Sequence, residues 1–184
     1  MKILAISGSL REASINSAFC RAAVRLAPEG VQAALFPGLG DIALFNPDLE
    51  ARPPLAVQRL RESVANADAL LIASPEYAHG ISGSMKNALD WLVSFEGTVG
   101  MPIALVNTSP RAHHAYAAIR EVLQTMSTVV VPEASPSIAL LGGAITEAAM
   151  LDSSEVRVAI RRIFEALAAH ISGQNASGPS FQLA

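Results

Sequence analysis

The chain has 184 residues, 51% of them hydrophobic and 16% charged, with a formal net charge of −3. This length predicts a single domain that buries about 70% of the surface its unfolded form exposes. The mild negative charge argues against a nucleic-acid-binding protein, which needs a basic face, and is too weak for a small electron carrier that docks by charge.

Cysteine content and hydropathy limit the class of protein further. Cys20 is the only cysteine, so neither an internal disulfide nor a cysteine-based metal site is expected, and a small buried thiol is the simplest interpretation. Polar residues interrupt the first apolar run at once, and no later run reaches the length that spans a bilayer. We therefore expect a cytoplasmic protein that binds neither membranes nor nucleic acids.

Apolar runs of strand length alternate with helical patterns along the chain. The runs are continuously apolar, which is typical of parallel strands covered on both faces. The predicted strands are Lys2–Ser7, Val31–Phe36, Ala69–Ser74, Pro102–Thr108 and Thr128–Val131, the last of which could extend over Ile138–Leu141. The predicted helices lie near Ser17–Ala27, Leu55–Asn66, Ser84–Phe95, His113–Thr125 and Ser153–Ile171.

Five β–α pairs with right-handed crossovers predict an α/β fold, a doubly wound sandwich of three layers around a parallel sheet. The common strand order for five such units is 2-1-3-4-5. We expect residues 1–172 to form the domain. Residues 173–184 are rich in Gly, Ser, Asn and Gln and predict a flexible tail.

Ligands of such folds bind beyond the carboxyl ends of the strands, where the strand order reverses. The predicted order places the first, third and fourth strands side by side. The loops that follow them, residues 9–17, 75–84 and 109–114, would share one rim. These loops are also the most unusual segments of the chain, so we expect the functional site there.

The first loop predicts a phosphate site. It is neither a dinucleotide-binding loop nor a Walker loop, because Gly8 is its only glycine and no Gly-Lys-Ser/Thr follows. Hydroxyls, amides and one guanidinium suit a phosphate monoester held on several sides. Helix capping by Ser14 or Asn16 would explain one of these polar residues, but not all five. The five are Ser9, Arg11, Ser14, Asn16 and Ser17.

The second loop combines a rigid proline, an aromatic residue and glycines after a buried strand. Its exposed backbone could hydrogen-bond the edge of a flat heterocycle, with Tyr77 lining the face. Taken alone, a tight turn with Tyr77 on the surface would be the preferred interpretation. Glu76 could act as a general acid or base, but a lone carboxylate in a loop more often makes a structural hydrogen bond.

Two motifs resemble those of the NADPH-dependent FMN reductase family, which includes bacterial quinone and chromate reductases. They are Gly8-Ser9-Leu10-Arg11-x-x-Ser14-x-Asn16 and Pro75-Glu76-Tyr77 followed by Gly83-Ser84-Met85-Lys86-Asn87-Ala88-Leu89-Asp90-Trp91. The resemblance covers residues 1–125 and implies a flavodoxin-like fold. It assigns the FMN phosphate to Ser9, Arg11, Ser14, Asn16 and Ser17, and the isoalloxazine edge to Pro75, Glu76, Tyr77 and the backbone of Ala78. Ser109, in the third loop, completes the expected cofactor site.

The resemblance also implies a reaction. NADPH or NADH would reduce bound FMN, and the flavin would pass electrons to a small acceptor such as a flavin or quinone. The cofactor performs this chemistry, so neither a catalytic side chain nor a metal is expected. A non-enzymatic FMN-binding electron carrier is the alternative.

The family commonly forms dimers or dimers of dimers with the flavin near the subunit boundary, so the resemblance implies a homodimer or homotetramer. Trp91 and Phe95 would fit such an interface, although aromatic residues on a sheet-packed helix are more often core.

The sequence departs from the family pattern in two places. Ala78 stands where the family usually has asparagine. The third loop, residues 107–114, is shorter than usual and lacks glycine, and its proline and histidines could reshape the pocket for the nicotinamide or the acceptor. His113 and His114 could instead be solvated residues at a helix start.

Overall fold

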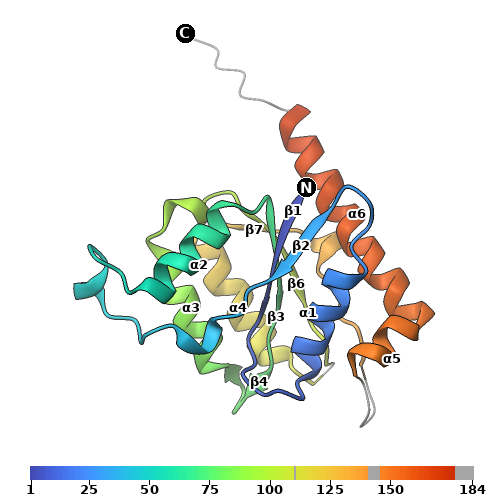
Figure 1. The fold of residues 1–184 in the computed structure, drawn as a ribbon, viewed down its shortest axis with the longest axis horizontal. Helices are drawn as coiled ribbons and strands as arrows, with labels where there is room; N and C mark the ends of the chain where they lie inside the picture. The colour runs from blue at the N-terminus through green and yellow to red at the C-terminus, as the bar shows by residue number, and fades with distance from the viewer. Residues whose placement is uncertain (110, 141–145, 177–184) are drawn as a thin grey trace.

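The computed structural model describes residues 1–109, 111–140 and 146–176, and its centre is a five-stranded parallel sheet (Figure 1). The strand order is β2-β1-β3-β6-β7, and each neighbouring pair is parallel. This is the predicted flavodoxin-like order. The strands are β1 (Lys2–Ser7), β2 (Gln32–Leu35), β3 (Ala69–Ala73), β6 (Pro102–Val106) and β7 (Val129–Val130).

Helices cover both faces of the sheet and complete a three-layer sandwich. One layer holds α1 (Ile15–Arg25), α5 (Glu147–Asp152) and α6 (Ser154–Ala176). The other holds α2 (Leu55–Ala65), α3 (Gly83–Val93) and α4 (His113–Thr125). A short antiparallel hairpin of β4 (Glu76–Tyr77) and β5 (Gly80–Ile81) lies between β3 and α3 in the chain. The 3-10 helices are Leu39–Asp41, Pro47–Leu49, Glu96–Thr98 and Pro132–Ala134.

Strand β1 shows why the central runs are continuously apolar. Ile3 and Ala5 pack in the core beneath α1 and α6, whereas Leu4 and Ile6 pack in the core beneath α2 and α3. Successive side chains of a strand point to opposite faces, so a strand with two covered faces needs apolar residues throughout. β2 departs from this expectation because it is an edge strand whose residues alternate between exposed and half-buried.

The C-terminal third differs most from the predicted elements. Helix α5 was not predicted, and β7 has only two residues. The proposed strand extension is wrong over Ile138–Leu140, where Asn107 and Ser137 form only an isolated bridge, and Leu141 lies outside the described residues. Helix α6 continues to Ala176, and residues 177–184 of the predicted tail are also outside the described part.

Trp91 belongs to the core of this chain. Its side chain is fully buried, its Nε1 donates to the Ala43 carbonyl at 2.7 Å, and its ring meets Phe45 edge-on with centroids 5.1 Å apart. The interface role considered for Trp91 is therefore wrong. Phe95 is half-buried, with the Arg61 guanidinium 5.6 Å from its ring centre. None of the described helices is long and apolar enough to cross a bilayer.

Candidate functional site

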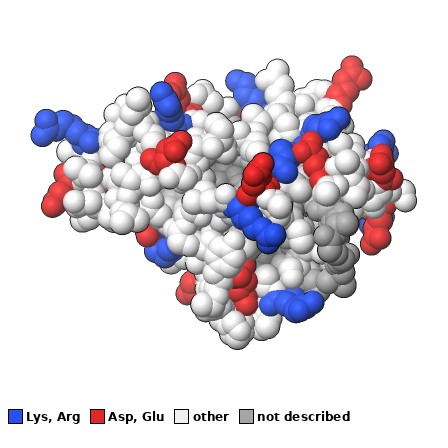
Figure 2. All heavy atoms as spheres, turned by 60° about the horizontal axis from the view of Figure 1, so that its bottom comes forward, with Lys and Arg blue, Asp and Glu red and all other residues white. Residues whose placement is uncertain are grey.

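The three loops predicted to form the site meet at the carboxyl edge of the sheet, which Figure 2 turns toward the reader. A cavity of about 410 Å³ lies between them. Asn16 comes from the first loop, Pro75 and Glu76 from the second, and Ser109 from the third. Acidic and basic side chains are interspersed on this face, which fits a small-molecule site better than a polyanion surface. The other lining residues are Ile15, Ser74, Thr108, Arg111, Ala112 and Leu140.

Gly8 fixes the path of the first loop against the second. Its N–H donates to the Ala73 carbonyl at 2.9 Å, and its own carbonyl accepts from Ser82 Oγ at 2.6 Å and Ser84 Oγ at 3.0 Å. A Cβ on Gly8 would lie 2.2 Å from Ser74 Oγ, so a larger residue would force the two loops apart. The glycine is needed here for close approach rather than for an unusual backbone angle.

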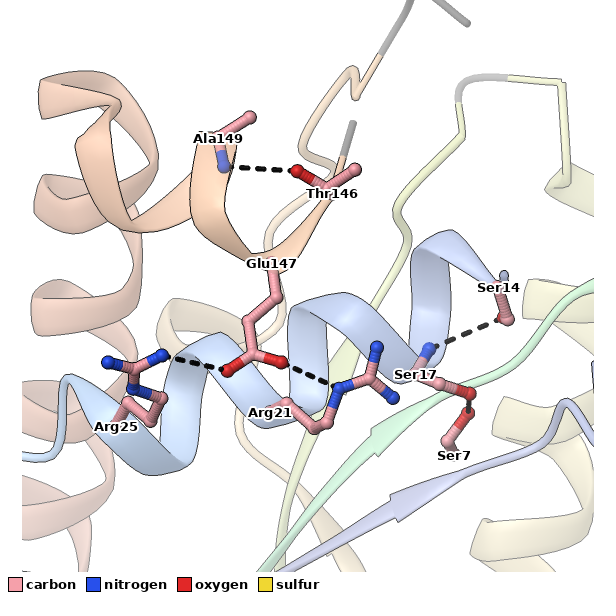
Figure 3. A network of polar contacts seen from close by, with 8 residues as sticks. All are labelled: Ser7, Ser14, Ser17, Arg21, Arg25, Thr146, Glu147 and Ala149. Atoms are coloured by element: carbon pink, nitrogen blue, oxygen red, sulfur yellow. Dashed lines mark hydrogen bonds and ion pairs between the residues drawn. The ribbon is translucent and has the colours of Figure 1, made fainter. Parts of the chain in front are cut away.

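Buried polar side chains gather around this loop. Ser7 Oγ lies 2.8 Å from Ser17 Oγ (Figure 3). Ser17 Oγ also donates to the Ser9 carbonyl at 3.4 Å. Ser14 caps α1, because its Oγ accepts from the Ser17 N–H at 3.3 Å. The capping interpretation therefore holds for Ser14, but the other hydroxyls form a wider network. Seven of the eight buried polar residues in the described part of the chain lie here: Ser7, Ser9, Ser14, Asn16, Ser17, Ser82 and Thr108.

The start of α1 offers unused donors. Within the described part of the chain, the backbone N–H groups of Ile15 and Asn16 have no hydrogen-bond partner. The first N–H groups of a helix lack intrahelical acceptors and carry its positive dipole end. Arg11 lies exposed in the preceding loop, where its guanidinium adds positive charge. These groups together suit an anion.

Asn16 links the first loop to the third. Its Oδ1 accepts from Thr108 Oγ1 at 2.8 Å, and both side chains are buried. Ser109 is half-buried, and its N–H donates to Asn107 Oδ1 at 3.1 Å, which shapes the turn after β6. Arg111 is exposed and lines the cavity, whereas Pro110 lies outside the described residues.

Glu76 stabilises the start of α4. Its Oε2 accepts from the Ala115 N–H at 2.9 Å, and Ala112, at the cap position, makes no side-chain cap of its own. The bond from Ala115 is the main cause that holds the pKa of Glu76 below its usual range, against an opposing effect of partial burial. The His114 N–H and the charges of His114 and His79 lower this pKa further. The structural interpretation of Glu76 is therefore favoured over an acid–base role.

The hairpin carries the other residues predicted in the second loop. Pro75 and Glu76 are half-buried, whereas Tyr77 is 55% exposed. The two turn residues, Ala78 and His79, have φ of 49° and 58°. Two left-handed residues in a two-residue turn match the type I′ hairpin, whose twist agrees with that of the strands. His113 and His114 are exposed first residues of α4, as in the interpretation that they are solvated at a helix start.

Comparison with known proteins identifies the family. Residues 1–140 match the model of the NADPH-dependent FMN reductase family. A quinone reductase of Pseudomonas putida is 34% identical over 156 residues, which cover 83% of this chain and 82% of the relative. The chain belongs to the NADPH-dependent FMN reductase family.

Other similarities agree with this family. An NAD(P)H-dependent FMN reductase of Pseudomonas aeruginosa is 47% identical over 92 residues, which cover about half of each protein, 50% and 49%. The structure of the flavoenzyme NAD(P)H:(acceptor) oxidoreductase FerB from Paracoccus denitrificans superposes with a TM-score of 0.69 at 24% identity. That superposition covers 92% of this chain and 98% of FerB, and it supports the fold alone.

The left-handed turn shows the cost of Ala78, which stands where the family usually has asparagine. Asparagine adopts positive φ more readily than most residues, because its short polar side chain bonds locally. Ala78 has no such group, so this chain holds the positive φ at a higher local cost.

Sequence reasoning missed the hydroxyls that hold the loops together: Ser74, Ser82, Ser84 and Thr108. The available signal was their position, since Ser74 and Thr108 end predicted strands, and Ser82 and Ser84 lie just before and at the start of a predicted helix. Except for the contact between Ser74 and Ser82, the partners in these contacts are far away in the chain; Ser82 and Gly8 are 74 residues apart.

A second cavity, of about 630 Å³, lies along β2 and α2, where Ala34, Phe36 and Arg59 line it. It is larger than the cavity at the carboxyl edge, but it lies beside an edge strand, away from the three loops. Convergent polar groups, rather than size alone, mark a ligand site. We therefore assign the candidate site to the carboxyl edge.

Proposed function

We propose that this chain is an NAD(P)H-dependent reductase that binds FMN at the carboxyl edge of the sheet and passes electrons to a small acceptor, such as a flavin or a quinone. The family supports the reaction class. The observation that carries the proposal is the convergence of three polar loops on one cavity beside the free N–H groups of α1.

The first loop fits the phosphate of FMN. The N–H groups of Ile15 and Asn16, the positive end of α1 and the Arg11 guanidinium all favour a doubly charged group. The hydroxyls of Ser9, Ser14 and Ser17 lie in the same network and can turn toward a phosphate oxygen. Thr108 donates a hydrogen bond to the Asn16 side chain, and this contact orders that end of the site.

The second and third loops fit the isoalloxazine end. Pro75 can offer its carbonyl, and Glu76, Tyr77 and Ala78 can offer backbone N–H and C=O groups, to the edge of the ring. Ser109 lines the same cavity as Pro75 and Glu76. Bound FMN supplies the capacity to accept and release electrons. The residues of this chain bind and orient it. Because Glu76 is engaged with α4, no side chain here is assigned an acid–base step.

The experiment that tests this function separates an enzyme from a carrier. Purified protein loaded with FMN is mixed with NADPH or NADH under anaerobic conditions, and the flavin absorbance is followed. We expect the flavin to bleach without a partner protein and to regain its colour when a quinone is added. Failure of both nicotinamides to bleach verified, bound FMN would favour the electron carrier.

We also propose a homodimer or homotetramer located in the cytoplasm, where reduced nicotinamides are available. Support for assembly comes from the segment between β2 and α2, which exposes Leu44, Phe45, Leu49 and, at its end, Leu55. Leu44 is 84% exposed. Neighbouring exposed apolar side chains are typical of interaction surfaces. Light scattering during size-exclusion chromatography measures the oligomeric state, and a strictly monomeric protein would contradict the proposed assembly.

A further inference from the structure

Three of the four histidines of this chain lie together at the junction of the β4–β5 hairpin and α4. The rings of His79 and His114 are stacked, with centroids 4.5 Å apart and an angle of 13° between their planes. The His113 ring is 4.1 Å from that of His114 and is tilted by 37°. This cluster has no part in the phosphate or ring contacts proposed above.

The stack is one contact between the side chains of the hairpin and the start of α4. The bond from the Ala115 N–H to the Glu76 carboxylate is another. His79 is a turn residue with φ of 58°, so the stack acts on a strained position of the hairpin. The hairpin is the segment proposed to offer its backbone to the flavin ring, and both contacts help to hold it against α4.

We propose that His79 and His114 are positioning residues: their stacked rings hold the hairpin against α4 in the arrangement that binds the flavin ring, and protonation of the cluster loosens it. The proposal rests on the function proposed above, because it concerns the same flavin site. It adds a pH-dependent control of cofactor binding.

The charges around the cluster give the direction of the pH effect. His113 and His114 are the first residues of α4, where the positive end of the helix opposes a cation. An imidazole in general gains its proton between pH 8 and 5. The Glu76 carboxylate can balance the positive charge of one protonated ring. A second charge would place two cations in neighbouring rings.

The other charged groups on these elements do not offset that repulsion. Arg111, just before α4, adds positive charge. Lys86 and Asp90 of α3 pair with each other, and Arg120 and Glu121 lie about two turns further along α4. Acidification should therefore weaken the stack, and flavin affinity should fall with it.

The test compares full-length protein with four variants, the fourth being the single His79→Phe, by FMN fluorescence titration at about pH 8 and about pH 5.5, on either side of the imidazole range. The double variant His79→Phe/His114→Phe keeps two stacking rings but cannot gain charge. His79→Ala removes the stack. His170→Phe is the control, because His170 lies on α6, where it bonds to Gln174.

We expect acidification to weaken FMN binding to the wild type and to His170→Phe. The loss of affinity should be about twofold to tenfold larger than in the double Phe variant, which corresponds to the free energy that an aromatic pair contributes. The FMN phosphate also titrates, but equally in every protein compared. His79→Ala should bind FMN more weakly at both pH values, with rescue by His79→Phe.

Two results would overturn the positioning role of the histidine stack while leaving the proposed function intact. One is an equal pH effect in the wild type and the double Phe variant. The other is unchanged FMN affinity in His79→Ala. Absence of FMN binding to the wild type at both pH values is a different outcome, since it would contradict the proposed function together with the positioning role of the stack.

Discussion

At the scale of single residues, the phosphate assignment depends most on Arg11. Arg11→Ala should weaken FMN binding by about 1.5–3 kcal/mol, because a hydrogen bond to a charged group is lost. Fluorescence titration of FMN measures the change. Arg59→Ala is the matched control, since Arg59 is also exposed but lines the other cavity. An unchanged dissociation constant in Arg11→Ala would show that the phosphate lies elsewhere.

Ala78 predicts a stabilising substitution. Its φ of 49° is unfavourable for a residue with a Cβ, so Ala78→Gly should raise the free energy of unfolding by about 0.5–1 kcal/mol, after allowance for the greater freedom of glycine in the unfolded chain. Denaturant unfolding measures it. Ala117→Gly, at an exposed position inside α4, should instead destabilise the protein by about 1 kcal/mol. A loss of stability in Ala78→Gly would contradict the strained turn.

At the scale of elements, Glu147 connects α5 to α1. Its carboxylate accepts from Arg21 Nε at 2.7 Å and from an Arg25 guanidinium nitrogen at 3.3 Å (Figure 3). The hydrogen bond from Arg21 is the main cause that lowers the pKa of Glu147, against a smaller opposing effect of burial. This contact holds α1, which follows the first loop, against the C-terminal part of the chain.

Glu147→Gln should lower the free energy of unfolding by about 0.5–1 kcal/mol at neutral pH, the range for a partly exposed ion pair. A carboxyl group whose pKa falls on folding adds stability above its unfolded pKa, near 4.5, and loses it as the pH drops through the lower folded value. The difference between wild type and variant should therefore vanish in acid. Unfolding at several pH values checks this, and a constant difference would contradict it.

The elements differ in how well the sequence alone could predict them. β1 and α4 have the predicted bounds, because a buried strand ends at hydroxylated residues and a helix has an amphipathic pattern of its own. α5 has six residues, and its ion-pair partners lie 126 and 122 positions away in the chain. No local pattern reports such a contact. The histidine stack joins residues 79 and 114 and was hidden for the same reason.

At the scale of the whole molecule, strand order is what brings the site together. The order β2-β1-β3-β6-β7 places the loops after β1, β3 and β6 at one edge, and this could be predicted from the count of β–α units. The contents of the edge were harder to foresee. Asn16, Pro75, Glu76 and Ser109 line one cavity, but the orientation of Glu76 toward α4 depends on packing that the sequence does not display.

The proposed flavin site depends above all on the amino end of α1, which we expect to hold the phosphate of FMN. Parallel titrations of the wild-type protein with FMN and with riboflavin, which lacks the phosphate, test it most directly. We expect FMN to bind at least about tenfold more tightly, since one charge-assisted hydrogen bond contributes that much. Equal affinities for the two flavins would contradict it.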